Sequence, residues 1–428
     1  MSELPVTLSK EDELSLFLEK CQINKSYGTL KSGDIVASFP ECRNFPRLIF
    51  KQAIPVNLLV SHGQLRDLMR FSSDDKWIYF PITNGAFRLL IKINRLSGEL
   101  VVVHDLTSDA NIGSTSLHAI DVNYGYVALI TSRRLVILSE DKSEVLFHEA
   151  LEGVNSQING VTLCNTGKKV FIYVAVNSGT GSVLGYEICP KEGTNKISLR
   201  NIQNVASGHL SAAISFGGPK NRSVNICLDG FKQPWIGERK DDGTLVEDKT
   251  MTLDYTEVKS HRGINYWSMM SSWDPTGDMV AIGCESSGYH VISKALKKII
   301  HKLPSGQVRC LKFSPNPSVP ILALQHNQLR IVETDNWSSV KLDREVTEGP
   351  GGHAWRRFNV NSLTWNRDGT KLLVAFLGCI VEYSVLIGVP TLCDICVTYV
   401  RKNIKDAEKY GWRMDILPPD LAESCTSI

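Results

Sequence analysis

A strand-turn-strand pattern recurs seven times along this chain. Each unit has an apolar run, a short turn of small polar residues and a second apolar run, which is typical of a β-hairpin. The apolar residues that immediately precede the seven turns lie 40 to 57 residues apart: Phe71, Val122, Cys164, Phe216, Trp273, Phe313 and Trp365. Such a period predicts repeated four-stranded units that pack side by side in one structure.

The fifth and seventh units, residues 273–282 and 365–375, are the clearest. Each has a Trp, a tight turn containing Asp or Asn and Gly, and an aliphatic strand. These units resemble degenerate blades of the WD-repeat family, although the Gly-His and Trp-Asp dipeptides of that family are missing from their usual places. The resemblance implies an all-β fold, a seven-bladed β-propeller over residues 31–388. A tandem of β-sandwiches is the alternative, and it explains the short period less well.

The two ends of the repeat region suggest how the ring closes. Residues 31–60 alternate enough to supply one or two strands. An N-terminal strand that completes the last blade would remove an open sheet edge, which predicts closure beside residues 371–388. Before this region, residues 1–30 are predicted to form a helical extension with Leu14, Phe17 and Leu18 on one side.

Charge and cysteine usage indicate a protein of the cytosol or nucleus. The formal net charge is only +2, which predicts no general attraction to nucleic acid or to an anionic membrane. The eleven cysteines are odd in number and irregularly spaced, as expected in a reducing compartment. We expect no membrane span, because no run of about 18 uncharged apolar residues occurs.

The sequence contains no recognisable catalytic or cofactor-binding motif. The ten histidines occur singly, without metal-ligand spacing, and no nucleophile elbow or phosphate-binding loop is present. We therefore predict a protein that is not an enzyme and that holds no metal or cofactor. Two alternatives stay open. Cys393 and Cys396 form a C-x-x-C that could serve redox or zinc chemistry, and a propeller channel could assemble a catalytic site from distant residues.

Two segments that read as loops are candidate contact surfaces for a target protein. They cover residues 231–259 and 341–358, and they place Trp and Arg, the residue types that dominate binding hot spots, among polar residues. The predicted contact residues are Trp235, Trp355, Arg356 and Arg357. Alternatively, both tryptophans pack on the propeller rim. The Arg356-Arg357 pair also resembles the paired-Arg motif of phosphoinositide-binding propellers, although its flanking residues differ from that family's.

The tail, residues 389–428, carries the most specific feature outside the repeats. Residues 390–400 predict a short helix on which Leu392, Cys396 and Val400 share one apolar face, widened by Ile395 and Tyr399. This pattern resembles the elongin-binding box that opens a SOCS box. The resemblance implies that these five residues contact elongin C, which acts with elongin B. The alternative is an amphipathic helix that packs on its own propeller.

A second element near the end of the tail, Leu417-Pro418, resembles the Leu-Pro element that helps a SOCS box select a cullin. Pro419 and Asp420 depart from the Leu-Pro-aliphatic-Pro pattern of cullin 5 partners, so we favour cullin 2 over cullin 5. Together these resemblances imply a substrate-recognition subunit of an elongin BC/cullin-RING ubiquitin ligase, in which the propeller binds a target protein. The alternative is a non-catalytic scaffold in complex assembly or trafficking.

Overall fold

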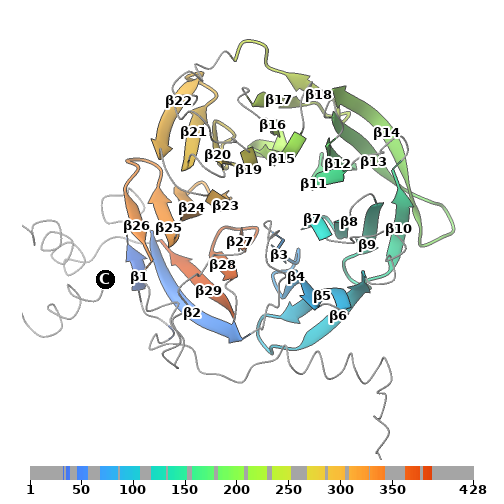
Figure 1. Cartoon of the computed structure of the whole chain (residues 1–428), viewed down its shortest axis with the longest axis horizontal. Coiled ribbons are helices and arrows are strands. Elements are labelled where there is room, and N and C mark those ends of the chain that lie inside the picture. The colour runs from blue at the N-terminus through green and yellow to red at the C-terminus, as the bar shows by residue number, and fades with distance from the viewer. Residues whose placement is uncertain are drawn as a thin grey trace, which may run out of the picture.

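The computed structural model describes most of the repeat region of the 428-residue chain. The described residues are 32, 35–38, 46–55, 68–84, 87–106, 117–131, 134–151, 157–177, 182–206, 211–228, 234–251, 268–284, 288–303, 308–326, 328–342, 362–375 and 379–387. The predicted N-terminal helix and the whole SOCS-box-like segment lie outside them. In the described ranges the strands form seven antiparallel sheets, arranged as blades around a central axis (Figure 1).

Six blades are built from four consecutive strands each, in sequence order from the axis outwards. Blade 1 consists of β3 (Arg70–Phe71), β4 (Trp77–Asn84), β5 (Phe87–Asn94) and β6 (Leu100–Asp105). Blade 2 consists of β7 (Leu117–Asn123), β8 (Tyr126–Thr131), β9 (Arg134–Ser139) and β10 (Val145–Ala150). Blade 3 consists of β11 (Gln157–Asn165), β12 (Val170–Asn177), β13 (Ser182–Pro190) and β14 (Ile197–Ala206). Blade 4 consists of β15 (Ser211–Gly217), β16 (Ser223–Leu228), β17 (Trp235–Arg239) and β18 (Leu245–Glu247), with the short 3-10 helix η1 (Pro219–Asn221) between β15 and β16. Blade 5 consists of β19 (Ser268–Trp273), β20 (Met279–Cys284), β21 (Gly288–Ser293) and β22 (Lys298–Leu303). Blade 6 consists of β23 (Val308–Phe313), β24 (Ile321–His326), β25 (Gln328–Glu333) and β26 (Ser339–Lys341).

Blade 7 combines the two ends of the repeat region. Its inner strands are β27 (Ser362–Trp365), β28 (Lys371–Ala375) and β29 (Cys379–Leu386), and outside them lie β2 (Arg47–Pro55) and β1 (Ile35–Ser38). The β2 strand pairs with β29 from Arg47 opposite Leu386 to Pro55 opposite Cys379, with one bulge after Phe50. The predicted closure by an N-terminal strand is therefore confirmed.

All seven turns that were predicted from sequence connect the innermost strand of a blade to the next strand outwards. The seven apolar residues that precede these turns, of which Phe71 is the first and Trp365 the last, each lie at or near the end of the innermost strand of their blade. These strands are β3, β7, β11, β15, β19, β23 and β27. The count of seven blades and the all-β character of the ring are therefore confirmed, and the alternative of tandem sandwiches is excluded.

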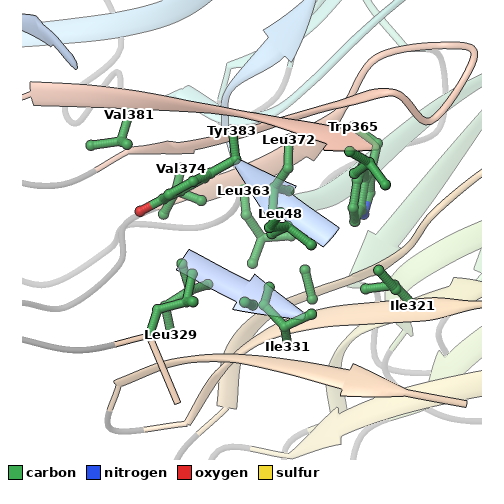
Figure 2. Packing of buried hydrophobic residues seen from close by; sticks show 14 of the residues in the cluster. Leu48, Ile321, Leu329, Ile331, Leu363, Trp365, Leu372, Val374, Val381 and Tyr383 are labelled. Atoms are coloured by element: carbon green, nitrogen blue, oxygen red, sulfur yellow. The ribbon is translucent and has the colours of Figure 1, made fainter. Parts of the chain in front are cut away.

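The core lies between neighbouring blades, so most strands are buried on both faces. In β8, for example, Ala128 and Ile130 pack in a cluster with blade 3, whereas Leu129 packs in a cluster with blade 1. Figure 2 shows the equivalent packing between blades 6 and 7, where Leu48 of the closing strand lies with Leu363. Burial on both faces explains why these strands read as continuous apolar runs rather than as alternating patterns.

The prediction of a loop over residues 231–259 is wrong for much of that range. Residues 231–259 were expected to interrupt the repeat, but β17 and β18 occupy residues 235–239 and 245–247 as the two outer strands of blade 4. The polar residues between them form a tight turn, in which the Lys240 N–H donates to the Thr244 carbonyl at 2.8 Å. Gly243 adopts a φ of 91° in this turn, which favours glycine.

The innermost strands are joined by a polar contact at every junction between blades. These groups are buried or partly buried, and polar groups in such places are usually hydrogen-bonded within the protein. In order round the ring, the contacts are Arg70 to the Asp121 carboxylate (3.6 Å), the Leu163 N–H to Asp121 (2.8 Å), the Thr162 hydroxyl to the Ile214 carbonyl (3.1 Å), Ser215 to Ser271 (2.6 Å), the Phe313 N–H to Ser272 (3.0 Å), the Trp365 indole N–H to the Lys312 carbonyl (3.1 Å) and the Met69 N–H to Ser362 (3.0 Å).

A buried histidine in blade 5 gives the fold a predicted sensitivity to acid. His290 of β21 is 4% exposed, and burial lowers its pKa to about 4, against about 6.5 in an unfolded chain. The folded state therefore holds this ring neutral. Its contribution to stability is complete above about pH 6.5 and is lost as the pH falls towards 4.

We expect the free energy of unfolding to fall by about 2 kcal/mol more in the wild type than in a His290→Gln variant between pH 7.5 and pH 5. Urea denaturation at both pH values measures this difference, and the other titrating groups cancel in the comparison. An equal loss in both proteins would rule out His290 as the source.

Candidate functional site

The central channel opens into a cavity of about 550 Å³ at the end of the ring where the innermost strands turn outwards. We call this cavity the mouth. It lies within the range of about 300–1,000 Å³ that is usual for ligand sites. All seven blades contribute to its lining, through residues 70–73, 119–124, 160–162, 214–218, 270–275, 312–313 and 364–367, together with Asn221 and Pro315.

One side of the mouth carries a partly buried ion pair. Arg70 Nε lies 3.6 Å from Asp121 Oδ1, and the side chains are 18% and 17% exposed. The Asp121 carboxylate also accepts the N–H groups of Leu163 at 2.8 Å and Val122 at 3.1 Å. Burial raises the pKa of Asp121, and it outweighs the opposing effects of Arg70, of these N–H groups and of Lys312.

Two further cations line the mouth from the opposite blades. Lys312 of blade 6 helps to lower the pKa of Asp121, and Arg367 of blade 7 helps to lower that of Tyr124, so both act on side chains of blade 2. For Tyr124 burial is the larger effect, and the net pKa is raised. The Tyr124 hydroxyl in turn accepts the Asn221 amide of blade 4 at 2.8 Å. Side chains from non-adjacent blades therefore meet at this one place.

The remaining carboxylate in the lining, Asp274, is used by its own turn. Its Oδ1 accepts the Met279 N–H at 2.7 Å, and its Oδ2 accepts the Thr276 N–H at 3.2 Å and the Thr276 hydroxyl at 2.5 Å. Both oxygens of this carboxylate therefore help to hold the hairpin between β19 and β20.

The sequence-predicted contact residues fall largely outside the described part of the chain. Trp355, Arg356 and Arg357 lie there, and so do all the predicted tail contacts: Leu392, Ile395, Cys396, Tyr399, Val400, Leu417 and Pro418. Trp235 is described, and it lies in β17 rather than in a flexible loop. It is 8% exposed and shares a buried cluster with Phe171 and Tyr173 of blade 3, so it has little surface to offer a target protein.

The sequence interpretation missed the mouth, although a signal for it exists. In six of the seven units a polar residue stands immediately before the apolar residue that precedes the turn: Arg70, Asp121, Ser215, Ser272, Lys312 and Thr364. All six line the mouth. Because side chains alternate along a strand, this position lies opposite the apolar one and faces the channel.

In the described ranges, no group of three or more His, Cys, Asp or Glu side chains is placed to hold a metal ion. Nor does this part of the chain contain a helix that is long and apolar enough to cross a membrane.

No protein-family model and no curated protein matches this chain. It is similar to a chain in the crystal structure of a mitotic checkpoint complex, with a TM-score of 0.54 and 13% identity over 85% of this chain and 99% of that one. The WD40 domain of Neurospora crassa Pan2 aligns with a TM-score of 0.49 and 10% identity, over 76% of this chain and 90% of that one. The fold is a seven-bladed β-propeller.

Proposed function

We propose that this chain is the substrate-recognition subunit of a cullin-RING ubiquitin ligase in the cytosol or nucleus. The propeller binds a target protein, and the tail binds elongin C, which brings elongin B and a cullin. The chain supplies no catalytic residue. It promotes ubiquitin transfer by holding the target near the transferring enzyme, which raises the effective concentration of the two reactants.

The observation that carries the proposal is the pattern of the tail sequence. Leu392, Cys396 and Val400 are spaced to share one helix face, and the Leu417-Pro418 element follows at a distance that suits a SOCS box. A leucine on such a face fits an apolar pocket of a partner, while the cysteine suits a tight site that a larger side chain would overfill.

The way in which the ring closes supports separate roles for the propeller, as the target-binding part, and for the tail, as the elongin-binding part. Among the described residues, every strand of the seven blades ends by Leu386, and the closing contacts are made by β2 rather than by a later segment. Leu386 and the following Ile387 are 44% and 45% exposed. In the described part of the chain, the closing strand is thus β2 from the N-terminal side of the ring, which is compatible with a tail that serves a partner.

Co-expression with elongins B and C tests the proposal. We expect the wild type to co-purify with both elongins, and a Leu392→Ala, Cys396→Phe double variant to bind roughly 100-fold more weakly. Leu296→Ala is the matched control, because it truncates a leucine that is 61% exposed in blade 5. The proposal fails if the wild type does not bring down elongins, and equal binding by the double variant would show that the box is wrongly assigned.

The cullin is tested in the same preparation. We propose that cullin 2, rather than cullin 5, is recovered with the elongin complex, and that replacing both Leu417 and Pro418 with alanine reduces the recovered cullin while leaving the elongins bound. Recovery of cullin 5 alone would reject the preference for cullin 2 without affecting the elongin assignment.

A further inference from the structure

We infer that the mouth of the propeller binds an acidic peptide segment of a partner protein. This deepens the proposed function and rests on its premise that the propeller is the target-binding part. It assigns both the place of binding and the chemistry of the bound segment. The binding site consists of Arg70, Lys312 and Arg367 with the surrounding hydroxyl and aromatic side chains of the mouth.

The charge of the lining favours an anionic ligand. Three cations and two carboxylates line the mouth, which leaves an excess of positive charge. The carboxylate of Asp274 is occupied by its own turn, and that of Asp121 by Arg70 and two backbone N–H groups. The carboxylates therefore serve the fold, whereas Arg367 is exposed at the opening. An anionic ligand complements this distribution.

The lining also supplies hydrogen-bond donors. The Arg367 guanidinium is exposed at the opening, and the Tyr124 hydroxyl, which accepts the Asn221 amide, carries an O–H of its own. Carboxylate oxygens accept hydrogen bonds from hydroxyl and guanidinium groups alike.

The placement of the cations favours a peptide over a nucleic acid. A nucleic acid is held along an extended track of Lys and Arg that neutralises successive phosphates. Here the three cations come from blades 1, 6 and 7 and gather around a single cavity. A cavity of about 550 Å³ accommodates a few side chains. A short acidic peptide combines this size with a compact negative charge.

The test begins with an unbiased probe. A phage-displayed library of random octapeptides is selected against the full-length protein without elongins, and an enriched peptide is then synthesised with a fluorophore. We expect Asp and Glu to be enriched over the input library. We also expect the peptide to bind at least tenfold more tightly than its counterpart in which Asn and Gln replace Asp and Glu, as measured by fluorescence anisotropy. Absence of acidic enrichment, or equal binding of the neutral counterpart, overturns the inference.

Substitutions then locate the site. Arg367→Gln and Lys312→Gln should each weaken binding of the acidic peptide roughly tenfold, because each removes one charge-assisted contact. Lys168→Gln is the matched control, since Lys168 is an exposed cation in the turn between β11 and β12 and lies outside the lining. Thermal melts confirm folding of each variant, and Arg367→Glu should bind a lysine-containing version of the peptide instead. Equal losses in the Arg367 and Lys168 variants would show nonspecific attraction and overturn the inference.

The elongin experiment separates the two proposals. Arg367→Gln should co-purify with elongins as the wild type does. If the acidic peptide binds the mouth but the wild type recovers no elongin, the ligase assignment fails and the mouth assignment stands. If elongins bind but no acidic peptide is selected, only the mouth assignment fails.

Discussion

A chain that starts at residue 57 is expected to lose the cooperative unfolding transition of the full-length protein, because it lacks the closing strand β2. In β2, Leu48, Ile49, Phe50 and Ile54 are each at most 8% exposed. Leu48 and Phe50 belong to the cluster between blades 6 and 7, whereas Ile54 belongs to the cluster between blades 7 and 1. The β2 strand therefore contributes to the packing of blade 7 against both of its neighbours, blades 6 and 1.

The expected size of this effect follows from burial. Each large apolar side chain of β2 contributes about 1.5–3 kcal/mol when it leaves water. Lost together, such contributions are comparable to the whole net stability of a typical domain, about 5–15 kcal/mol. The deletion also uncovers the β29 edge, whose unpaired backbone groups favour association between chains. We therefore expect no cooperative melt by circular dichroism, and soluble aggregates in size-exclusion chromatography.

A chain that starts at residue 31 is the control, since it keeps both β1 and β2. It should retain the cooperative transition. A synthetic peptide of residues 46–55 should partly restore the transition when added to the shorter chain. If the two truncated chains melt alike, β2 does not close the ring as the register indicates.

The ring was predictable from sequence because its signal is local and repeated. Each turn needs small polar residues beside a buried apolar one, as at Trp273 and Trp365, and this requirement recurs in every blade. Closure was also predictable, because a sheet edge left open at residues 379–386 demands a partner strand. By contrast, β17 was missed. Burial on both faces removes the alternation by which a strand is normally recognised, and the Lys240–Thr244 turn reads as a long polar loop.

The mouth was not predictable for a different reason. Arg70 and Lys312 are separated by most of the chain, and each looks like a solitary surface charge in its own segment. Only the closure of the ring brings Lys312 close enough to act on the pKa of Asp121. Once the blade register is known, the polar position before each turn identifies the lining directly. For the tail the situation is reversed. Its apolar pattern can be read from the sequence, but its residues lie outside the described ranges.

Replacing Glu382 with alanine is expected to lower the free energy of unfolding by about 3–5 kcal/mol, the range measured when one partner of a buried ion pair is removed. The Glu382 side chain is 3% exposed, and its Oε1 lies 2.5 Å from Nη1 of Arg95, which is 14% exposed. Its Oε2 accepts the Gln52 amide of β2 at 2.9 Å. Loss of the carboxylate therefore leaves a largely buried guanidinium without its counter-charge at the junction of blades 7 and 1.

The matched control is an exposed pair of the same kind. Asp241 and Arg222 are 74% and 55% exposed, so Asp241→Ala should change stability by no more than about 1 kcal/mol. A double variant, Glu382→Ala with Arg95→Met, removes both charges and should be more stable than Glu382→Ala alone. Urea denaturation of the four proteins measures these differences. A Glu382→Ala loss as small as that of Asp241→Ala would show that the buried pair does not stabilise the closure.

The position of the loss can be followed as well as its size. Gln52 donates to Glu382 and also to the Arg95 carbonyl at 3.0 Å, and the Arg95 Nε donates to the Asp75 carbonyl at 3.1 Å. These bonds connect the closing strand β2 to its neighbour β29 in blade 7 and to blade 1. In hydrogen exchange, the amides of β2 should therefore lose protection first in the Glu382→Ala variant, while those of β12 in blade 3 keep theirs. A uniform loss of protection would instead indicate global destabilisation, with no special role for this junction in holding the closing strand.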